Sequence, residues 1–258
     1  MAGSTYDAFA ADYHWIFSDQ HLSGEQFLDR YREVLASLPA KAEVLDCACG
    51  TGLEAMALVR SGFRVTACDA SESMVDHARQ LFADAGVGVR VEQCTWDSLA
   101  STLPAGFDAV FCTGNSIAHC EEEAAMLEAF GGMRAVLGSA GVLVVESRDW
   151  ERMYADRPRL EVRDHVAFRD GVRGLCLYIW TVPESWGEPC TAEIVLLLDD
   201  GETLTHRLVK LRFTPYRRAD LTKRLELSGF EKVSVVDDHP GRYFVTATKS
   251  ALAGQQPD

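Results

Sequence analysis

The 258-residue sequence lacks the features of a membrane-spanning or secreted protein. No segment reaches the roughly 18 consecutive apolar residues that a membrane-spanning helix needs. The first residues, MAGSTYDAFAADYHW, contain neither the basic stretch nor the apolar stretch of a secretory signal. We therefore expect a soluble, cytoplasmic protein that does not act at a membrane.

Basic residues are scarce relative to acidic ones. The chain has 25 lysines and arginines against 39 aspartates and glutamates, a formal net charge of −14, and the basic residues are scattered. A surface of this sign repels phosphate groups, so nucleic acid and anionic lipid are not expected as partners.

The eight cysteines have no spacing that indicates a disulfide framework or a zinc ribbon. Five of them lie in or at the ends of apolar runs that predict strands: Cys47, Cys49, Cys68, Cys94 and Cys112. Cys47-x-Cys49 lacks the two-residue spacing of a zinc ribbon, and no other cysteine pair repeats it. We therefore expect reduced thiols in or near the core and no metal site.

Apolar strand patterns alternate with amphipathic helix patterns over residues 41–150. Strands are predicted at 42–47, 64–68, 87–94, 107–112 and 141–146, with helices at 53–60, 73–85 and 121–137. A helix at 219–228 and strands at 232–236 and 243–249 follow near the C-terminus. The order predicts an α/β fold: a Rossmann-like, seven-stranded, mostly parallel sheet with helices on both faces.

Two further regions flank this core. Residues 25–38 place apolar side chains at spacings of three and four and predict one helix that ends before Pro39. Residues 159–182 and 193–213 alternate apolar and polar side chains and predict an antiparallel insertion, with Asp199-Asp200-Gly201 as a hairpin turn. The predicted domains are a helical lid at 1–40, a core at 41–150 and 216–250, and an insertion at 151–215 that serves as a substrate lid or a dimer surface.

The strongest local motif is Val44-Leu45-Asp46-Cys47-Ala48-Cys49-Gly50-Thr51-Gly52, a strand that runs into a glycine turn before a helix. Glycines allow the backbone to approach a ligand closely. Asp69 ends the next strand, seventeen residues after Gly52, where an acidic side chain binds a ribose in dinucleotide sites. Asp46 would repel a pyrophosphate and suits a cationic amino or sulfonium group, so the pattern favours S-adenosylmethionine over NAD.

Residues 43–52 resemble the first motif of the class I S-adenosylmethionine-dependent methyltransferases. Val65-Thr66-Ala67-Cys68-Asp69-Ala70-Ser71 with Met74 resembles their second motif, and Gln93-Cys94-Thr95-Trp96-Asp97 resembles the third. Cys112-Thr113-Gly114-Asn115-Ser116-Ile117-Ala118-His119 is similar to a loop of the glycine and glycine/sarcosine N-methyltransferases. Members of this subfamily form oligomers with N-terminal exchange, so a homo-oligomer is a further expectation.

The resemblance implies a set of site residues. The implied cofactor-binding residues are Tyr6, Trp15, Asp46, Ala48, Gly50, Gly52, Asp69, Ala70, Met74, Thr95, Trp96, Cys112 and His119. The implied catalytic residues are Tyr6, Asn115, His119 and Arg148, and Arg148 falls where the subfamily binds the substrate carboxylate. Tyr178 and Tyr216 are candidates for the substrate side by neighbourhood only.

Ordinary structural roles compete with these functional ones. Asp69 is also suited to a turn that closes a strand. Asp46 and Asn115 are also suited to cap the helices that follow them. Arg148 is also suited to a surface ion pair with Asp149 or Glu151.

The function implied is methyl transfer from S-adenosylmethionine to the nitrogen of a small, carboxylate-bearing amine. The reaction is a displacement at a methyl carbon, so the protein supplies geometry and desolvation. One alternative is transfer to the oxygen of a small specialised metabolite, with His119 or His165 as general base. Another is an enzyme or sensor that uses a different part of the same cofactor.

Overall fold

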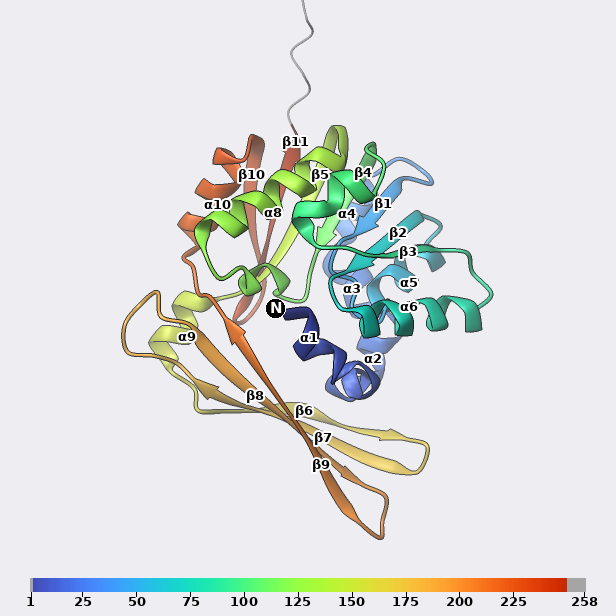
Figure 1. The fold of residues 1–258 in the computed structure, drawn as a ribbon, viewed down its shortest axis with the longest axis vertical. Helices are drawn as coiled ribbons and strands as arrows, with labels where there is room; N and C mark the ends of the chain where they lie inside the picture. The colour runs from blue at the N-terminus through green and yellow to red at the C-terminus, as the bar shows by residue number, and fades with distance from the viewer. Residues whose placement is uncertain (1, 250–258) are drawn as a thin grey trace, which may run out of the picture.

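A seven-stranded sheet forms the centre of the protein, seen in a computed structural model that describes residues 2–249 (Figure 1). Its strand order is β10-β11-β5-β4-β1-β2-β3. Neighbours from β3 to β5 run parallel, whereas β11 is antiparallel to both β5 and β10. The strands are β1 Glu43–Asp46, β2 Arg64–Asp69, β3 Arg90–Gln93, β4 Phe107–Cys112, β5 Leu137–Arg148, β10 Phe230–His239 and β11 Arg242–Lys249. The predicted fold class is confirmed.

Helices cover both faces of this sheet because its central strands are apolar on both sides. Val44 and Leu45 of β1 are fully buried and belong to different apolar clusters on opposite faces. One layer contains α3 Glu25–Arg30, α4 Arg32–Ser37, α5 Leu53–Arg60 and α6 Glu72–Asp84; the other contains α7 Leu99–Thr102, α8 Glu123–Val136 and α10 Arg218–Leu227.

The prediction of a single helix at 25–38 is wrong in one respect, because the segment forms two helices, α3 and α4, that are separated at Tyr31. Tyr31 leaves the helical conformation, with φ −101° and ψ 17°. Its ring is buried and packs against Phe27, Phe111 and Phe244, and its hydroxyl donates to Glu146. The break directs this tyrosine onto the sheet.

Four antiparallel strands form a separate second sheet, in the order β6-β7-β8-β9. They are β6 Leu160–Arg169, β7 Val172–Thr181, β8 Cys190–Asp199 and β9 Leu204–Phe213, preceded by the short helix α9 Trp150–Asp156. The predicted antiparallel insertion is therefore present. Figure 1 shows this sheet extending below the main body, with the N-terminal segment between the two sheets.

The N-terminal segment comprises α1 Ala2–Asp7, the 3-10 helix η1 Ala10–Ile16 and α2 Asp19–Leu22. Trp15 of η1 packs against β7 at Gly174, where an added Cβ would lie 2.3 Å from the indole. Arg169 of β6 donates to the carbonyl of Phe17 at 2.9 Å. On the other side, the Asp7 carboxylate accepts a hydrogen bond from the Ser71 hydroxyl at 2.5 Å. The segment thus connects the second sheet to the core.

No helix within residues 2–249 combines the length and apolarity needed to cross a membrane.

Two adjacent glycines in α8, Gly131 and Gly132, differ in how closely they approach the segment after β3. A Cβ at Gly132 would lie 2.0 Å from the carbonyl oxygen of Trp96, whereas one at Gly131 would meet nothing within 4 Å. We expect Gly132→Ala to lower the free energy of unfolding by about 1–3 kcal/mol through overpacking. Gly131→Ala is the matched control, and its higher helix propensity predicts a gain of up to about 1 kcal/mol. Urea denaturation of both variants measures this difference, and equal effects would contradict it.

Candidate active site

The glycine loop lies where β1 ends and α5 begins, at the carboxyl edge of the parallel strands. Gly50 and Gly52 both have positive φ, 51° and 88°, which side chains rarely adopt. A Cβ at Gly52 would lie 3.1 Å from the Cβ of Ala78 and 3.2 Å from the ring of Phe82. Gly52 therefore allows close packing on α6, while Gly50 faces a cavity.

Asp69 holds the glycine loop in place. One carboxylate oxygen accepts the Gly50 N–H at 2.9 Å, and the other accepts the Ser71 N–H at 2.9 Å. Burial raises the pKa of Asp69, although these backbone donors act in the opposite direction. The side chain closes its strand, as expected of a turn residue, and also lines the cavity.

A cavity of about 470 Å³ opens above this loop, within the size range of small-molecule sites. Nine of the predicted cofactor residues line it: Tyr6, Ala48, Gly50, Asp69, Ala70, Met74, Thr95, Trp96 and His119. Four others, Trp15, Asp46, Gly52 and Cys112, are not among its lining residues, and neither are Asn115 and Arg148. Most of the predicted cofactor residues therefore lie on one cavity.

Other lining residues were not predicted as site residues. They include Tyr13, Cys47, Cys94, Gly114, Ser116 and Glu128. Four of these residues lie within the motifs that resemble the methyltransferases, so membership in a motif could have predicted them: Cys47, Cys94, Gly114 and Ser116. Tyr13 sits between the two predicted aromatic residues of the N-terminal segment, Tyr6 and Trp15, whereas no pattern pointed to Glu128.

Asp46 is buried beneath the loop. One oxygen accepts a long hydrogen bond from the Ala48 N–H at 3.4 Å, and the other has no partner among the described residues. Burial, with Glu54 and Asp69 nearby, raises the pKa of Asp46 well above its usual value. The suggested helix-capping role is wrong, because Gly52 occupies the N-cap of α5 and no side chain caps it.

Tyr6 and His119 meet above the cavity, 113 positions apart in the sequence, with the Tyr6 hydroxyl 3.0 Å from His119 Nε2. His119 Nδ1 lies 3.1 Å from the carbonyl oxygen of Arg212, which only accepts, so Nδ1 carries the proton. Nε2 is then the acceptor, and Tyr6 donates to it. Burial lowers the pKa of His119 to about 4 and raises the pKa of Tyr6, so both side chains are neutral near pH 7.

Trp96 forms one wall of the cavity and is fixed in orientation. Its indole N–H donates to the carbonyl oxygen of Cys47 at 2.7 Å. Trp96 begins the 3-10 helix η2 Trp96–Ser98, which Thr95 caps. The third motif is thereby attached to the first.

Asn115 stabilises the edge of the site. Its side-chain oxygen accepts the Arg148 N–H at 2.9 Å. The predicted capping role is wrong, because Asn115 makes no side-chain cap to the 3-10 helix η3 Ser116–His119. The contact joins the ends of β4 and β5.

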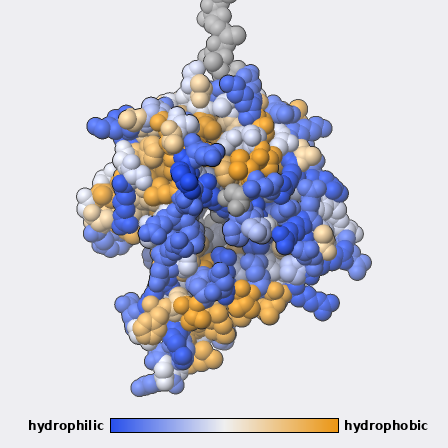
Figure 2. Space-filling model, turned by 180° about the vertical axis from the view of Figure 1, so that it is seen from behind, coloured by the Kyte–Doolittle hydropathy of each residue, from blue (hydrophilic) through white to orange (hydrophobic). Residues whose placement is uncertain are grey.

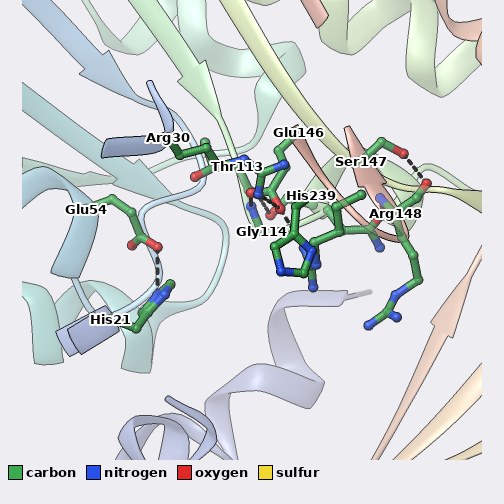
Figure 3. A network of polar contacts seen from close by, with 12 residues as sticks. His21, Arg30, Glu54, Thr113, Gly114, Glu146, Ser147, Arg148 and His239 are labelled. Atoms are coloured by element: carbon green, nitrogen blue, oxygen red, sulfur yellow. Dashed lines mark hydrogen bonds and ion pairs between the residues drawn. The ribbon is translucent and has the colours of Figure 1, made fainter. Parts of the chain in front are cut away.

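The Arg148 side chain extends from β5 away from Glu146 (Figure 3). It pairs with Glu161 at 3.1 Å, and its guanidinium lies 4.8 Å from the ring centre of Trp180. The suggested surface pair with Asp149 or Glu151 is wrong, because those carboxylates pair with Arg218 and Arg217.

Glu146 joins four segments near the ends of β4 and β5 (Figure 3). Its carboxylate pairs with Arg30 at 2.9 Å and Arg242 at 2.5 Å, and it accepts the Gly114 N–H at 3.0 Å. Although Glu146 is buried, the two arginines lower its pKa to about 2. This buried ion cluster fixes the N-terminal helices and the C-terminal strand to the site.

All eight cysteines are free and buried. Cys47, Cys94 and Cys120 reach the cavity wall. No cluster of three or more potential metal ligands exists among the described side chains.

Residues 44–141 match the family model of the methyltransferase domain. Glycine N-methyltransferase from Oryctolagus cuniculus is 33% identical over 123 residues, covering 43% of this chain and 42% of that protein. Glycine/sarcosine N-methyltransferase from Parasynechococcus marenigrum is 34% identical over 110 residues, covering 43% and 39%. This chain therefore aligns with about two fifths of the length of these curated relatives.

Solved structures resemble nearly the whole chain. An amino pentose methyltransferase from Micromonospora echinaspora, with S-adenosylmethionine bound, has a TM-score of 0.74 at 22% identity and covers 94% of this chain and 97% of its own. A sugar N-methyltransferase from Streptoalloteichus has a TM-score of 0.72 at 22% identity, with coverage of 90% and 89%. At this identity the likeness shows the fold. With the domain match, it confirms the resemblance to the class I S-adenosylmethionine-dependent methyltransferases.

The buried ion cluster predicts a large, pH-dependent effect of Glu146→Gln. The variant leaves Arg30 and Arg242 without their carboxylate, so we expect it to lose roughly 3 kcal/mol of unfolding free energy at pH 7. The pKa of Glu146 falls from 4.5 to about 2 on folding. The contribution of the ionised Glu146 carboxylate to the free energy of unfolding is therefore complete above pH 4.5, and it disappears as the pH falls towards 2.

Guanidinium denaturation at several pH values measures this effect. Glu43→Gln is the matched control, because Glu43 lies on β1 and forms an exposed pair with Arg64. That pair should contribute less than about 1 kcal/mol. A Glu146→Gln variant as stable as this control at pH 7 would contradict the assigned cluster.

Proposed function

We propose that this chain is an S-adenosylmethionine-dependent methyltransferase that methylates the nitrogen of a small amine carrying a carboxylate, of the glycine or sarcosine kind. The central observation is the juxtaposition of the Asp69-held glycine loop with a neutral Tyr6–His119 pair on one cavity. The domain match and the names of the curated relatives support this proposal.

The cavity suits the cofactor at both of its ends. Each Asp69 oxygen accepts one backbone N–H, which leaves lone pairs for the hydroxyl groups of a ribose. Met74, Ala70 and Trp96 supply a largely apolar wall for an adenine ring. Under the loop, Asp46 lies outside the cavity lining, and one of its oxygens has no partner among the described residues, which leaves it able to accept a hydrogen bond from the amino group of the cofactor. S-adenosylmethionine supplies a methyl group on a positively charged sulfur that is already activated for displacement.

The Tyr6–His119 pair favours an amine acceptor over a hydroxyl. Transfer to a hydroxyl needs a general base with a pKa near the working pH. With a pKa of about 4, and with Nε2 occupied by Tyr6, His119 is a poor base. His165, the other candidate base, lies on β6 and does not line the cavity. A neutral amine has its own lone pair, and the Tyr6 oxygen can accept one of its N–H groups.

A surplus of arginines near the second sheet favours an anionic group on the acceptor. Arg148 pairs with Glu161, and Arg242 pairs with Glu146. Arg163 stacks on Tyr178, and its buried Nε has no hydrogen-bond partner among the described residues. Arginine binds carboxylates through paired donors. Arg148 and Arg163 lie outside the lining of the cavity. We propose that they bind the acceptor carboxylate at its margin.

The N-terminal segment and the second sheet act as lids in this proposal. Tyr6 reaches the cavity from α1, which the Asp7–Ser71 hydrogen bond holds against the core. The segment also contacts the second sheet through Trp15. Closing both over the acceptor would exclude water from the reacting groups.

The direct test is incubation of the purified chain with methyl-labelled S-adenosylmethionine and a panel of acceptors. The panel contains glycine, sarcosine, a neutral amine of similar size, an amino sugar and a phenol. We expect label on glycine or sarcosine, and S-adenosylhomocysteine as the second product. Transfer only to the amino sugar or the phenol would reject the proposed acceptor. Methylthioadenosine in place of S-adenosylhomocysteine would reject methyl transfer itself.

Tyr6→Phe tests the role of the hydroxyl. It removes the oxygen that faces the acceptor and keeps the ring, so we expect kcat to fall by about 10–100-fold while cofactor affinity changes less than about threefold. Tyr154→Phe is the matched control, because that hydroxyl donates to the Glu188 carbonyl and Tyr154 does not line the cavity. Steady-state kinetics and calorimetry separate the two effects, and an unchanged kcat in Tyr6→Phe would contradict the role.

A further inference from the structure

Three cysteine side chains reach the wall of the cavity, and they differ in their surroundings. They are Cys47, Cys94 and Cys120. Cys94 has 8% of its surface exposed and follows the last residue of β3, directly before Thr95 and Trp96. A small molecule that enters the cavity therefore meets Cys94 beside the wall proposed to contact the adenine ring.

A second thiol lies behind Cys94. Cys68 is fully buried on the neighbouring strand β2 and belongs to the same apolar cluster. The Cys94 N–H donates to the carbonyl oxygen of Asp69 at 3.0 Å, which holds the chain after β3 against the end of β2. In this position the thiols of Cys68 and Cys94 hydrogen-bond to each other. Cys94 therefore has the cavity on one side and another thiol on the other.

The hydrogen bond makes the two thiols chemically different. It lowers the pKa of Cys94 against the opposing effect of burial, whereas the same contact and burial raise the pKa of Cys68 well above its usual value. Because the thiolate is the nucleophilic form of cysteine, Cys94 is the member of the pair that attacks an oxidant. Cys68 keeps its proton and acts as the hydrogen-bond donor.

The other two cavity thiols lack this combination. Burial raises the pKa of Cys120 to about 12 and raises the pKa of Cys47 well above its usual value. Cys47 has a thiol neighbour of its own, Cys112 on β4, but that contact raises the pKa of Cys47 further. Buried cysteines without support for the thiolate are inert. Among the described residues, Cys94 is therefore the cavity thiol that is best suited to react.

We propose that Cys94 and Cys68 form an oxidation site for small hydroperoxides, which closes a Cys94–Cys68 disulfide and weakens cofactor binding. The Cys94 thiolate attacks the hydroxyl oxygen of the hydroperoxide, the O–O bond breaks, and the departing alkoxide or hydroxide takes up a proton. The Cys68 thiol then attacks the sulfenic acid left on Cys94, and the S–S bond forms as water leaves. The hydroperoxide gains the two electrons that the thiols lose.

The disulfide would change the cavity wall, because the two cysteines are diagonal to each other. Cys68 is opposite Glu92 in the register of β2 and β3, so Cys94 lies two positions further along. Such a pair has Cα atoms about 8 Å apart, and a disulfide needs them within about 6.8 Å. The irregular chain after β3 must therefore move towards β2. This movement strains the hydrogen bond from the Trp96 indole to the Cys47 carbonyl, which fixes the wall.

The test is treatment of the full chain with hydrogen peroxide, alkylation of the remaining thiols and mass spectrometry of the peptides. We expect a crosslinked pair of peptides containing Cys68 and Cys94. Calorimetry should show an affinity for S-adenosylhomocysteine at least about tenfold lower, restored by dithiothreitol. S-adenosylhomocysteine present during oxidation should prevent the crosslink, because it covers Cys94.

Cys68→Ser and Cys120→Ser are the matched variants. Cys68→Ser removes the second thiol, so no crosslink to Cys94 should form, whereas Cys120→Ser removes a cavity thiol outside the pair and should crosslink like the wild type. The wild-type crosslink is measured without either variant, so a variant that fails to fold leaves the test intact. A wild-type chain without the crosslink, a crosslink between Cys47 and Cys112 instead, or a crosslinked chain with unchanged affinity would overturn the proposal.

The crosslink is independent of the proposed reaction, whereas its effect on affinity rests on the proposed cofactor site. A wild-type chain that forms the crosslink but never binds S-adenosylhomocysteine would overturn the cofactor site and the effect on affinity, and would leave the oxidation site supported.

Aggregation is followed in the same samples by light scattering, because the second sheet exposes apolar side chains. Figure 2 shows them gathered over the lower part of the molecule, and Leu204 and Phe168 expose 68% and 67% of their surface. Large exposed apolar patches favour association. We expect the oxidised chain to lose affinity without aggregating. A loss of affinity confined to aggregated samples would contradict the assigned effect of the disulfide.

Discussion

The carboxylate of Asp69 is the contact on which the geometry of the site depends. It joins the N–H of Gly50 to the N–H of Ser71, so the glycine loop and the start of α6 keep a fixed separation. Asp69 is half-buried, and leaving its oxygens without donors would be costly. The cavity floor is therefore preorganised by one side chain that also lines the cavity.

Around this floor, the fold assembles the site from segments that are distant in the sequence. Parallel strands bring the first, second and third motifs to one edge of the sheet, as the doubly wound topology requires. The N-terminal segment crosses this edge and carries Tyr6 to His119. The ion cluster around Glu146 holds α3, β5 and β11 together beneath it.

Most of the fold was predictable because each element carries a strong local pattern. The boundaries of α5 and β4 were predicted without error, since glycine turns and apolar runs delimit them. The break at Tyr31 could not be predicted from local pattern. It depends on the contacts of the Tyr31 ring with Phe111 of β4 and Phe244 of β11, and on its hydrogen bond to Glu146. Within the site, motifs located Asp69 and Trp96. By contrast, the contact of Arg148 with Glu161 depends on how the second sheet packs on β5, which no local spacing encodes.

The most direct measurement of the central role of Asp69 is the affinity of the purified chain for S-adenosylhomocysteine by calorimetry. Asp69→Asn keeps one oxygen acceptor but replaces the other with a donor, so affinity should fall by at least about tenfold. Asp76→Asn, at an exposed position of α6, serves as the control and should bind normally. Equal affinities for the wild type, Asp69→Asn and Asp76→Asn, or no binding to the wild type, would contradict the proposed cofactor site.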